Sequence, residues 1–440
     1  MFILFRNAME LLYQWKLREN KKPLIIRGAR QVGKTWLMRE FGNKAYAETV
    51  YVNFDNNRRA EELFSADMNV GRIIEGLEIY AGHKIDAKNT LLIFDEVQEV
   101  PRALASLKYF NETAPEYQVI CAGSLLGIAL HQGSSFPVGK VEFVDLYPMS
   151  FTEFIRAMGK EQFVKLLESG DFQMVCAFRQ EYTDLLKHYY YIGGMPEAVK
   201  AFSENRDFNE AREIQYNILA AYEQDFSKHA PNEIVPRIRM LWNSIPAQLA
   251  RENKKFIYGL IKKGARAKDY ELAMLWLSDC GLVHIVNRVT APNIPLKAYE
   301  DLKAFKLFLL DVGLLSCMTR LRQDTLLDGN VLFKEFKGAL SEQYVLQQLK
   351  TLRGIQPYYW SNERNSAEID FILDNGSDVI PVEVKAEVNL QAKSLKSYQE
   401  RFSPKYSVRT SMADYNNEGK LLNLPLWAIE TISQARVFIS

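Results

Sequence analysis

The chain has 440 residues, 48% of them hydrophobic and 25% charged, which is typical of a globular protein with about two to four domains. Its 55 Lys and Arg residues nearly cancel its 54 Asp and Glu residues, leaving a formal net charge of +1. This balance excludes an overall basic chain, so any nucleic-acid contact would have to come from a local basic patch.

The cysteines and histidines also limit the possible classes of protein. Cys121, Cys176, Cys280 and Cys317 are far apart and form no C-x-x-C motif, so we expect a reducing compartment, the cytoplasm. The five histidines do not lie at metal-ligand spacing, which argues against a zinc site. The N-terminal apolar run is too short for a signal peptide, and no apolar stretch is long enough to span a bilayer. We therefore expect no membrane partner.

The most specific motif follows the first predicted strand. Residues 23–27 predict a buried strand, and residues 36–41 predict a helix. The loop between them fits G-x-x-x-x-G-K-[ST] at every fixed position: Gly28, Ala29, Arg30, Gln31, Val32, Gly33, Lys34 and Thr35. In such a loop the backbone N–H groups bind phosphate oxygens, the lysine reaches the β- and γ-phosphates, and the Thr hydroxyl holds Mg²⁺. We therefore predict an ATP and Mg²⁺ site, against the alternative of a chance glycine turn before a helix.

Four further apolar runs follow, separated by helical patterns, at residues 50–54, 91–95, 118–124 and 141–146. Runs of this kind predict a parallel sheet that is covered on both faces. Ligands of open α/β sheets bind beyond the carboxyl ends of the strands. Asp55, Asp95 and Ser124 all lie at such ends, in agreement with a nucleotide site.

The run at residues 91–96 ends in two acids, Asp95 and Glu96. Asp95 would hold Mg²⁺ beside Thr35, directly or through water, and Glu96 would polarise the attacking water. Alone, the pair would indicate only a junction between a strand and a loop. Because it follows the Lys34 loop by roughly sixty residues, it predicts ATP hydrolysis with Glu96 and Lys34 as catalytic residues. Ser124 is a third catalytic candidate that would contact the γ-phosphate or the water, although Gly-Ser is also common in turns.

The pattern becomes helical between residue 151 and about residue 331. Residues 267–280 predict an amphipathic helix, and strand-like runs follow at residues 282–286 and 305–310, an order compatible with a winged helix. Four basic residues precede and enter this helix: Lys262, Lys263, Arg266 and Lys268. They would form either a DNA-contacting patch or an ordinary solvated helix end.

Two predicted strands near the C-terminus, residues 368–373 and 381–386, alternate apolar with charged residues. On each strand the charged residues share one face: Glu368 and Asp370 on the first, Glu383 and Lys385 on the second.

If these strands pair, Asp370 and Glu383 would bind one Mg²⁺, and Glu342 on the preceding helix would complete the metal site. Lys385 would lie beside them. Carboxylates with a lysine suit metal-assisted phosphodiester cleavage, so Asp370, Glu383 and Lys385 are candidate catalytic residues. The alternative is two amphipathic strands with solvated polar faces.

These motifs resemble a large group of prokaryotic AAA-type ATPases joined to a C-terminal domain of unknown function. The resemblance covers nearly the whole chain, at residues 28–35, 91–96, 122–124, 146–154, 193–197, 276–277 and 308–315. It implies ATP binding, ATP hydrolysis and a restriction-endonuclease-like C-terminal fold. In that fold Glu342, Asp370, Glu383 and Lys385 match the PD-(D/E)xK pattern. Related chains often carry Gly-Arg at residues 139–140, but this chain has Lys140. Because lysine lacks the bidentate fork of arginine, we assign Lys140 no role at the γ-phosphate.

We therefore expect an α/β protein with three parts. Residues 1–199 form a P-loop AAA-type ATPase domain with a helical extension, residues 200–330 a helical, winged-helix-like domain, and residues 331–440 a nuclease-like domain. The expected function is a Mg²⁺-dependent ATPase coupled to a DNA-associated nuclease-like domain. The alternative is a nucleotide-dependent switch whose C-terminal domain binds a partner without catalysis. Besides ATP, the candidate partners are DNA and a second copy of the chain.

Overall fold

The computed structural model describes residues 4–123, 136–251, 255–328, 334–362, 367–387 and 393–434. It separates into two compact units. The first unit comprises Arg6–Tyr147 with Asp279–Gly281, and the second unit comprises the rest of the chain. Within the described ranges, no helix combines the length and the apolar character needed to cross a membrane.

The first unit contains a parallel sheet of five strands in the order β2-β3-β4-β1-β5. The strands are β1 (Leu24–Arg27), β2 (Glu48–Asn53), β3 (Thr90–Asp95), β4 (Gln118–Ala122) and β5 (Glu142–Asp145). Every residue of β3 and β4 is buried, as expected for the centre of a sheet covered on both faces. The parallel sheet predicted from the apolar runs is thus confirmed.

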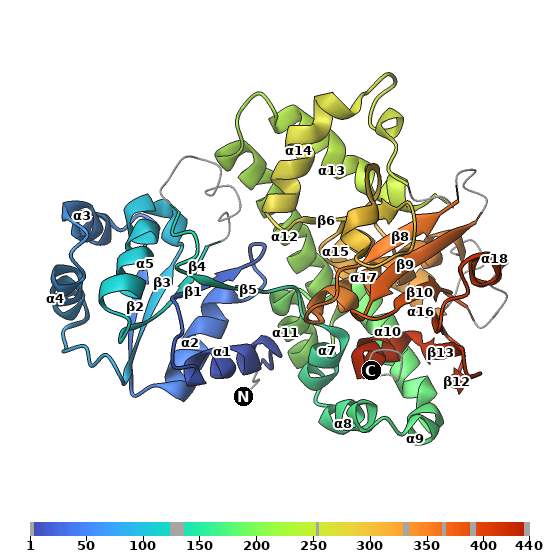
Figure 1. The fold of residues 1–440 in the computed structure, drawn as a ribbon, viewed down its shortest axis with the longest axis horizontal. Coiled ribbons are helices and arrows are strands. Elements are labelled where there is room, and N and C mark those ends of the chain that lie inside the picture. The colour runs from blue at the N-terminus through green and yellow to red at the C-terminus, as the bar shows by residue number, and fades with distance from the viewer. Residues whose placement is uncertain are drawn as a thin grey trace. The chain divides into compact units, whose positions relative to one another are not determined.

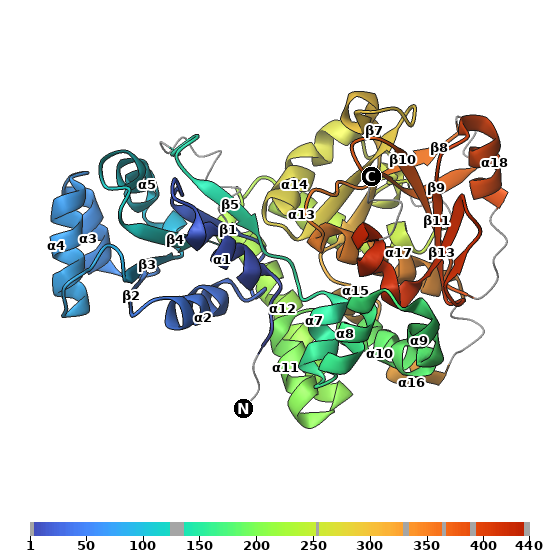
Figure 2. The same ribbon diagram turned by 60° about the horizontal axis from the view of Figure 1, so that its bottom comes forward.

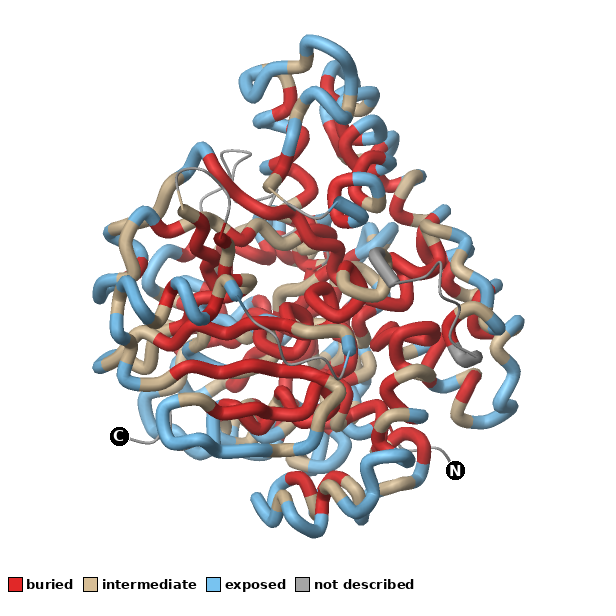
Figure 3. Tube along the Cα trace, turned by 90° about the vertical axis from the view of Figure 1, so that its right-hand side faces the viewer, coloured by how far each residue is buried: buried red, intermediate tan, exposed pale blue. Residues whose placement is uncertain are grey.

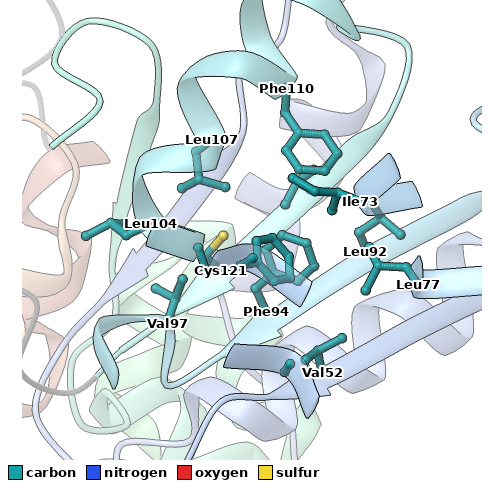
Figure 4. Close-up of a cluster of buried hydrophobic side chains, with 14 of the residues drawn as sticks. Val52, Ile73, Leu77, Leu92, Phe94, Val97, Leu104, Leu107, Phe110 and Cys121 are labelled. Carbon is teal, nitrogen blue, oxygen red and sulfur yellow. The ribbon is translucent and has the colours of Figure 1, made fainter. Parts of the chain in front are cut away.

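Helices cover both faces of this sheet (Figures 1 and 2). The helices of the unit are α1 (Ala8–Leu17), α2 (Lys34–Ala45), α3 (Arg58–Ala66), α4 (Val70–Ala81) and α5 (Pro101–Thr113). Helix α2 lies on one face, where a side chain at Gly42 would touch Leu91 and Ile93. Helices α3, α4 and α5 pack on the other face around Leu92 and Phe94 (Figure 4). The two faces follow from the alternation of side chains along β3.

The second unit begins with a bundle of helices. They are α7 (Phe151–Ala157), α8 (Glu161–Ser169), α9 (Phe172–Ala177), α10 (Arg179–Ile192), α11 (Pro196–Asn205), α12 (Phe208–His229), α13 (Val235–Leu249) and α14 (Ala267–Asp279). The first of them starts with a capping box, in which the Ser150 hydroxyl accepts from the Glu153 N–H and the Glu153 carboxylate accepts from the Ser150 N–H.

A mixed sheet of eight strands follows, in the order β12-β13-β11-β10-β9-β8-β6-β7. Its strands are β6 (Val283–Val289), β7 (Glu300–Leu309), β8 (Tyr358–Ser361), β9 (Glu368–Asp374), β10 (Val379–Val384), β11 (Ser407–Ser411), β12 (Asn416–Asn417) and β13 (Leu421–Pro425). The remaining helices are α15 (Val312–Met318), α16 (Gln323–Asp328), α17 (Lys334–Thr351) and α18 (Lys393–Phe402). Figure 3 shows mostly buried residues along the strands of this sheet and exposed residues on loops and outer helices.

The strands β6 and β7 do not form the wing of a separate domain. They pair with each other in antiparallel fashion, as expected after the helix α14, but β6 also pairs with β8 through Arg288 opposite Tyr359 and Val289 opposite Trp360. The hydrogen-bonded sheet therefore runs across the expected boundary at residue 330. The helices from Phe151 onward likewise belong to the second unit, although we expected those up to residue 199 to extend the ATPase.

Buried polar side chains of α17 connect the sheet to the helical bundle. The Gln343 side chain pairs with both backbone groups of Leu309, accepting from its N–H at 3.0 Å and donating to its carbonyl at 2.6 Å. One turn later, Gln347 donates to Asp311 at 2.9 Å, and Asp311 accepts from the Gly194 N–H at 2.6 Å. Since an unsatisfied buried polar group destabilises the fold, these contacts hold the bundle and the sheet as one unit.

We expect Gly194→Ala to destabilise the protein by about 1–3 kcal/mol, because a Cβ there would lie 2.1 Å from the Met149 carbonyl oxygen. The matched control is Gly338→Ala in α17, where nothing lies within 4 Å of the added methyl group. Alanine there should stabilise the helix by about 0.5–1 kcal/mol. Thermal unfolding of both variants measures the difference, and equal melting temperatures would contradict this packing.

Candidate functional site

The loop between β1 and α2 has a conformation that depends on its glycines. Gly28 has a φ of 152°, and a Cβ at this residue would lie 2.2 Å from the Leu146 carbonyl oxygen. Gly33, at the start of α2, has a φ of 94°. Only glycine adopts such backbone angles without strain. The loop is thus shaped as the motif requires, with the N-terminus of α2 at its end.

Lys34 is 6% exposed, and its ammonium donates to the carbonyls of its own loop, to Gly28 at 2.9 Å and to Ala29 at 2.7 Å. Burial lowers the pKa of Lys34 to about 8, although the nearby carboxylates of Glu96 and Asp95 act in the opposite direction. Neutral carbonyls do not compensate a buried charge fully, so a phosphate group would be a better partner for this ammonium.

Asp95 lies at the end of β3 on the face that packs against α2, because it alternates with Ile93 and Leu91. The Thr35 hydroxyl donates to the Asp95 carboxylate at 2.6 Å, and the Tyr51 hydroxyl donates to the same oxygen at 2.9 Å. A hydroxyl and a carboxylate in contact, next to a phosphate-binding loop, are the oxygen ligands that Mg²⁺ takes in such sites. The residues present therefore fit an ATP-bound Mg²⁺ ion.

Glu96 follows with a φ of 50°, a left-handed conformation that is rare for a residue with a side chain. The Gln98 side chain donates to the Glu96 carboxylate at 2.7 Å. The Glu96 N–H also donates to Asp95 at 3.1 Å. The two acids thus lie at the same end of β3 but have different side-chain partners. The Asp95 carboxylate accepts from Thr35 and Tyr51, and the Glu96 carboxylate accepts from Gln98.

Three residues of this site were missed by the sequence analysis: Arg6, Tyr51 and Gln98. Arg6 is buried and donates to the carbonyls of Val32 and Tyr147, each at 2.6 Å, so it holds the loop against the end of β5. No local sequence motif identifies Arg6, because its hydrogen-bond partners are distant in the sequence. Tyr51 lies opposite Ile93 in the sheet, and that register is the signal that would have revealed it.

Two other sequence expectations concern this unit. Ser124 lies outside the described residues. The Lys140 ammonium pairs with the Glu112 carboxylate at 2.9 Å. This contact gives Lys140 a structural partner on α5.

Residues 20–155 match the family model of the AAA domain. This match covers most of the first unit, whose parallel sheet and phosphate-binding loop agree with a P-loop AAA-type domain. Residues 183–325 and 337–429 match two domains of unknown function, DUF8612 and DUF4143. No curated protein sequence matches the chain.

Solved structures with similarity to the chain include the Walker-type ATPase PABY2304 of Pyrococcus abyssi, at 15% identity and a TM-score of 0.47, covering 72% of this chain and 96% of that one. The ORC1 protein of Aeropyrum pernix in complex with DNA has 14% identity and a TM-score of 0.27, with coverages of 72% and 91%. The ORC2 protein of the same organism has 12% identity and a TM-score of 0.34, with coverages of 78% and 95%. These TM-scores are below 0.5, so the AAA assignment depends on the family match and the geometry.

In the second unit, β9 and β10 pair in antiparallel fashion, with Phe371 opposite Val382, as the proposed C-terminal site requires. The Val384 N–H donates to the Asp370 carboxylate at 2.8 Å. The Lys385 ammonium pairs with the Glu383 carboxylate at 2.7 Å. Asp370 of β9 and Glu383 of β10 therefore lie on neighbouring strands, and Lys385 directly follows β10.

An unexpected residue, Lys306 of β7, completes this cluster. Its ammonium lies 2.5 Å from the Glu368 carboxylate, 3.5 Å from that of Glu342 and 3.7 Å from that of Asp370. The side chain is fully buried. Burial alone would lower the pKa of Lys306, but the three carboxylates outweigh it and raise the pKa above its usual range. A lysine inside an apolar run, residues 305–310, was the signal that the sequence analysis did not use.

Two of the three carboxylates predicted to bind Mg²⁺ here, those of Glu342 and Asp370, therefore lie beside an ammonium instead. Among the described residues, no group of three or more His, Cys, Asp or Glu side chains is placed to hold a metal ion. Glu383 differs from the other acids because it pairs with Lys385, and burial raises its pKa. The residues of this cluster do not fit the metal that a nuclease site needs.

Nucleotide affinity should depend on pH through Lys34. Because the pKa of Lys34 is lowered to about 8, the free protein loses the ammonium as the pH rises through this value. We expect ADP affinity to be constant below about pH 7.5 and to fall by about tenfold per pH unit above about pH 8.5. A fluorescent ADP analogue titrated without Mg²⁺ measures it.

The control for this titration is Lys34→Arg, which keeps its charge over the whole range. The affinity of this variant for ADP, where it is measurable, should not change with pH. A flat profile in the wild type would mean that Lys34 stays charged in the free protein, or that its charge does not contribute to binding.

Proposed function

We propose that the AAA domain binds ATP with Mg²⁺ and hydrolyses it. The observation that carries this proposal is the 2.6 Å hydrogen bond between Thr35 and Asp95, directly after the loop that contains Lys34. It supports the proposal because it brings a hydroxyl and a carboxylate, both suited to Mg²⁺, next to the predicted phosphate-binding loop. The match of residues 20–155 to the AAA domain supports the same function.

In this proposal the Lys34 ammonium exchanges the carbonyls of Gly28 and Ala29 for oxygens of the β- and γ-phosphates. Thr35 and Asp95 hold the Mg²⁺ ion, which when bound neutralises charge on the phosphates. Tyr51 keeps the Asp95 carboxylate oriented by donating to one of its oxygens.

Glu96 accepts the proton of the attacking water. A general base must lie within hydrogen-bond reach of that water, and Glu96 follows the Mg²⁺ ligand Asp95 at the carboxyl end of β3. Gln98 holds the Glu96 carboxylate in place through the 2.7 Å hydrogen bond.

We expect Glu96→Gln to bind ATP as the wild type does but to hydrolyse it at least about 100-fold more slowly, because the amide cannot take the proton. Lys34→Ala should lose both ATP binding and hydrolysis. The matched control is Glu99→Gln, an exposed residue three positions further on, which should hydrolyse ATP normally. Phosphate release and nucleotide affinity together measure these effects. Wild-type turnover in Lys34→Ala would refute the proposal.

We propose further that ATP turnover is coupled to DNA contact by the second unit. The basic residues Lys262, Lys263, Arg266 and Lys268 support this, since all four are exposed at the start of α14. In this proposal the C-terminal part of the unit is nuclease-like, with Asp370, Glu383 and Lys385 as its catalytic residues.

A second candidate function is a nucleotide-dependent switch. Here the ATP state controls a protein partner or self-assembly, and the C-terminal part binds without catalysis. The burial of Lys306 among the carboxylates favours this candidate over nuclease chemistry, because a nuclease of this kind needs a metal between them.

Duplex DNA should raise the ATPase rate, and the ratio of stimulated to basal rate should fall at least about fivefold in Lys262→Glu/Lys263→Glu, because phosphate contacts depend on positive charge. The control is Lys393→Glu/Lys396→Glu, an equal charge change on the exposed face of α18. Absence of stimulation in the wild type would contradict the DNA proposal. Mg²⁺- or Mn²⁺-dependent plasmid cleavage that disappears in Lys385→Ala would support the nuclease over the switch.

A further inference from the structure

The charged cluster of the second unit, formed by Glu342, Glu368, Asp370 and Lys306, includes a cationic side chain, the ammonium of Lys306. Three carboxylates approach the Lys306 ammonium, Glu342 from α17 and both Glu368 and Asp370 from β9, at 3.5, 2.5 and 3.7 Å. An ammonium has three N–H donors and no acceptor, so it is suited to a site whose other members are acceptors. The lysine thus supplies a counter-charge to the buried Glu342 carboxylate and to the partly buried carboxylates of Glu368 and Asp370.

The Asp370 carboxylate has one oxygen near this ammonium and the other on the Val384 N–H, at 2.8 Å. A Mg²⁺ ion needs near-octahedral oxygen ligands at about 2.0–2.1 Å. A metal ion among the same carboxylates would therefore have to displace the ammonium or lie beside it. Two cations in contact in a buried site repel each other strongly.

Lys306 has no simple route out of the cluster. It is fully buried, its backbone lies in β7 opposite Val286 of β6, and its ammonium lies 5.1 Å from the centre of the Tyr359 ring. The ring face adds a favourable cation–π contact. Moving the side chain to solvent would require the β6–β7 edge to open.

We infer that Lys306 occupies the cation position of this cluster, so that the wild-type protein binds no divalent metal there and removal of the ammonium creates a divalent-metal site. The ammonium thus supplies one positive charge at the position where a divalent metal would supply two. This inference does not depend on the proposed ATPase activity, because it concerns the second unit alone.

The test uses the full-length protein with Lys34→Ala and without nucleotide, so that the ATP site contributes no metal binding. Mn²⁺ is the probe, followed by its electron paramagnetic resonance signal and by thermal unfolding. The Lys34→Ala protein and its Asp370→Asn derivative should bind Mn²⁺ equally. A site in Lys34→Ala that disappears with Asp370→Asn would overturn the inference.

Lys306→Met, which keeps most of the length of the side chain without its charge, should lower the melting temperature because it removes a counter-charge of Glu342, Glu368 and Asp370. Mn²⁺ should then bind tightly and restore several degrees of stability. Asp370→Asn added to this variant should remove the effect. A folded Lys306→Met protein whose melting temperature does not respond to Mn²⁺ would refute the created site. If Lys306→Met does not fold, Lys306→Gln provides the same comparison, and the Lys34→Ala pair still decides whether the wild-type cluster binds metal.

Discussion

A buried ammonium needs a compensating partner, and this requirement shapes both charged sites of the protein. Lys34 and Lys306 are each almost completely buried, but they meet different partners. The first donates to two neutral carbonyls and has a pKa lowered to about 8. The second lies among three carboxylates, which raise its pKa. The positive charge of Lys34 is therefore only partly compensated, and a phosphate group would compensate it better. Lys306 already has carboxylates as counter-charges.

The geometry of the nucleotide site follows from the sheet beneath it. Side chains alternate along β3, so Leu91, Ile93 and Asp95 share the face that packs on α2, and Thr35 lies at the start of that helix. The parallel pairing of β2 with β3 then brings Tyr51 to the same carboxylate. The hydrophobic cluster on the opposite face, around Leu92 and Phe94, keeps the strand in this register. The placement of the Mg²⁺ ligands is thus a consequence of the core packing.

In the second unit, hydrogen bonds connect segments on both sides of the domain boundary that the sequence pattern suggested near residue 330. The change from helical to strand-like patterns near residue 331 suggested a new domain. In the structure, β6 and β7 join the C-terminal sheet, and the glutamines Gln343 and Gln347 of α17 bond to the segment at Leu309–Asp311. The Gly194 turn is attached to that same segment through Asp311. One folding unit therefore contains most of both domains of unknown function.

The sequence by itself determined the phosphate-binding loop, the parallel sheet and the pair Asp95–Glu96, because each is specified by residues that are neighbours in the chain. It also predicted β9 and β10 as strands, and it indicated which carboxylates would meet if the two strands paired, as they do. Only the tertiary structure decided the roles of Arg6 and Lys306. Their partners lie far away in the sequence, and local pattern does not record which distant strand packs beside a given residue. The charge balance of the C-terminal cluster therefore became visible only when the Lys306 side chain of β7 was placed beside the carboxylates of β9 and α17.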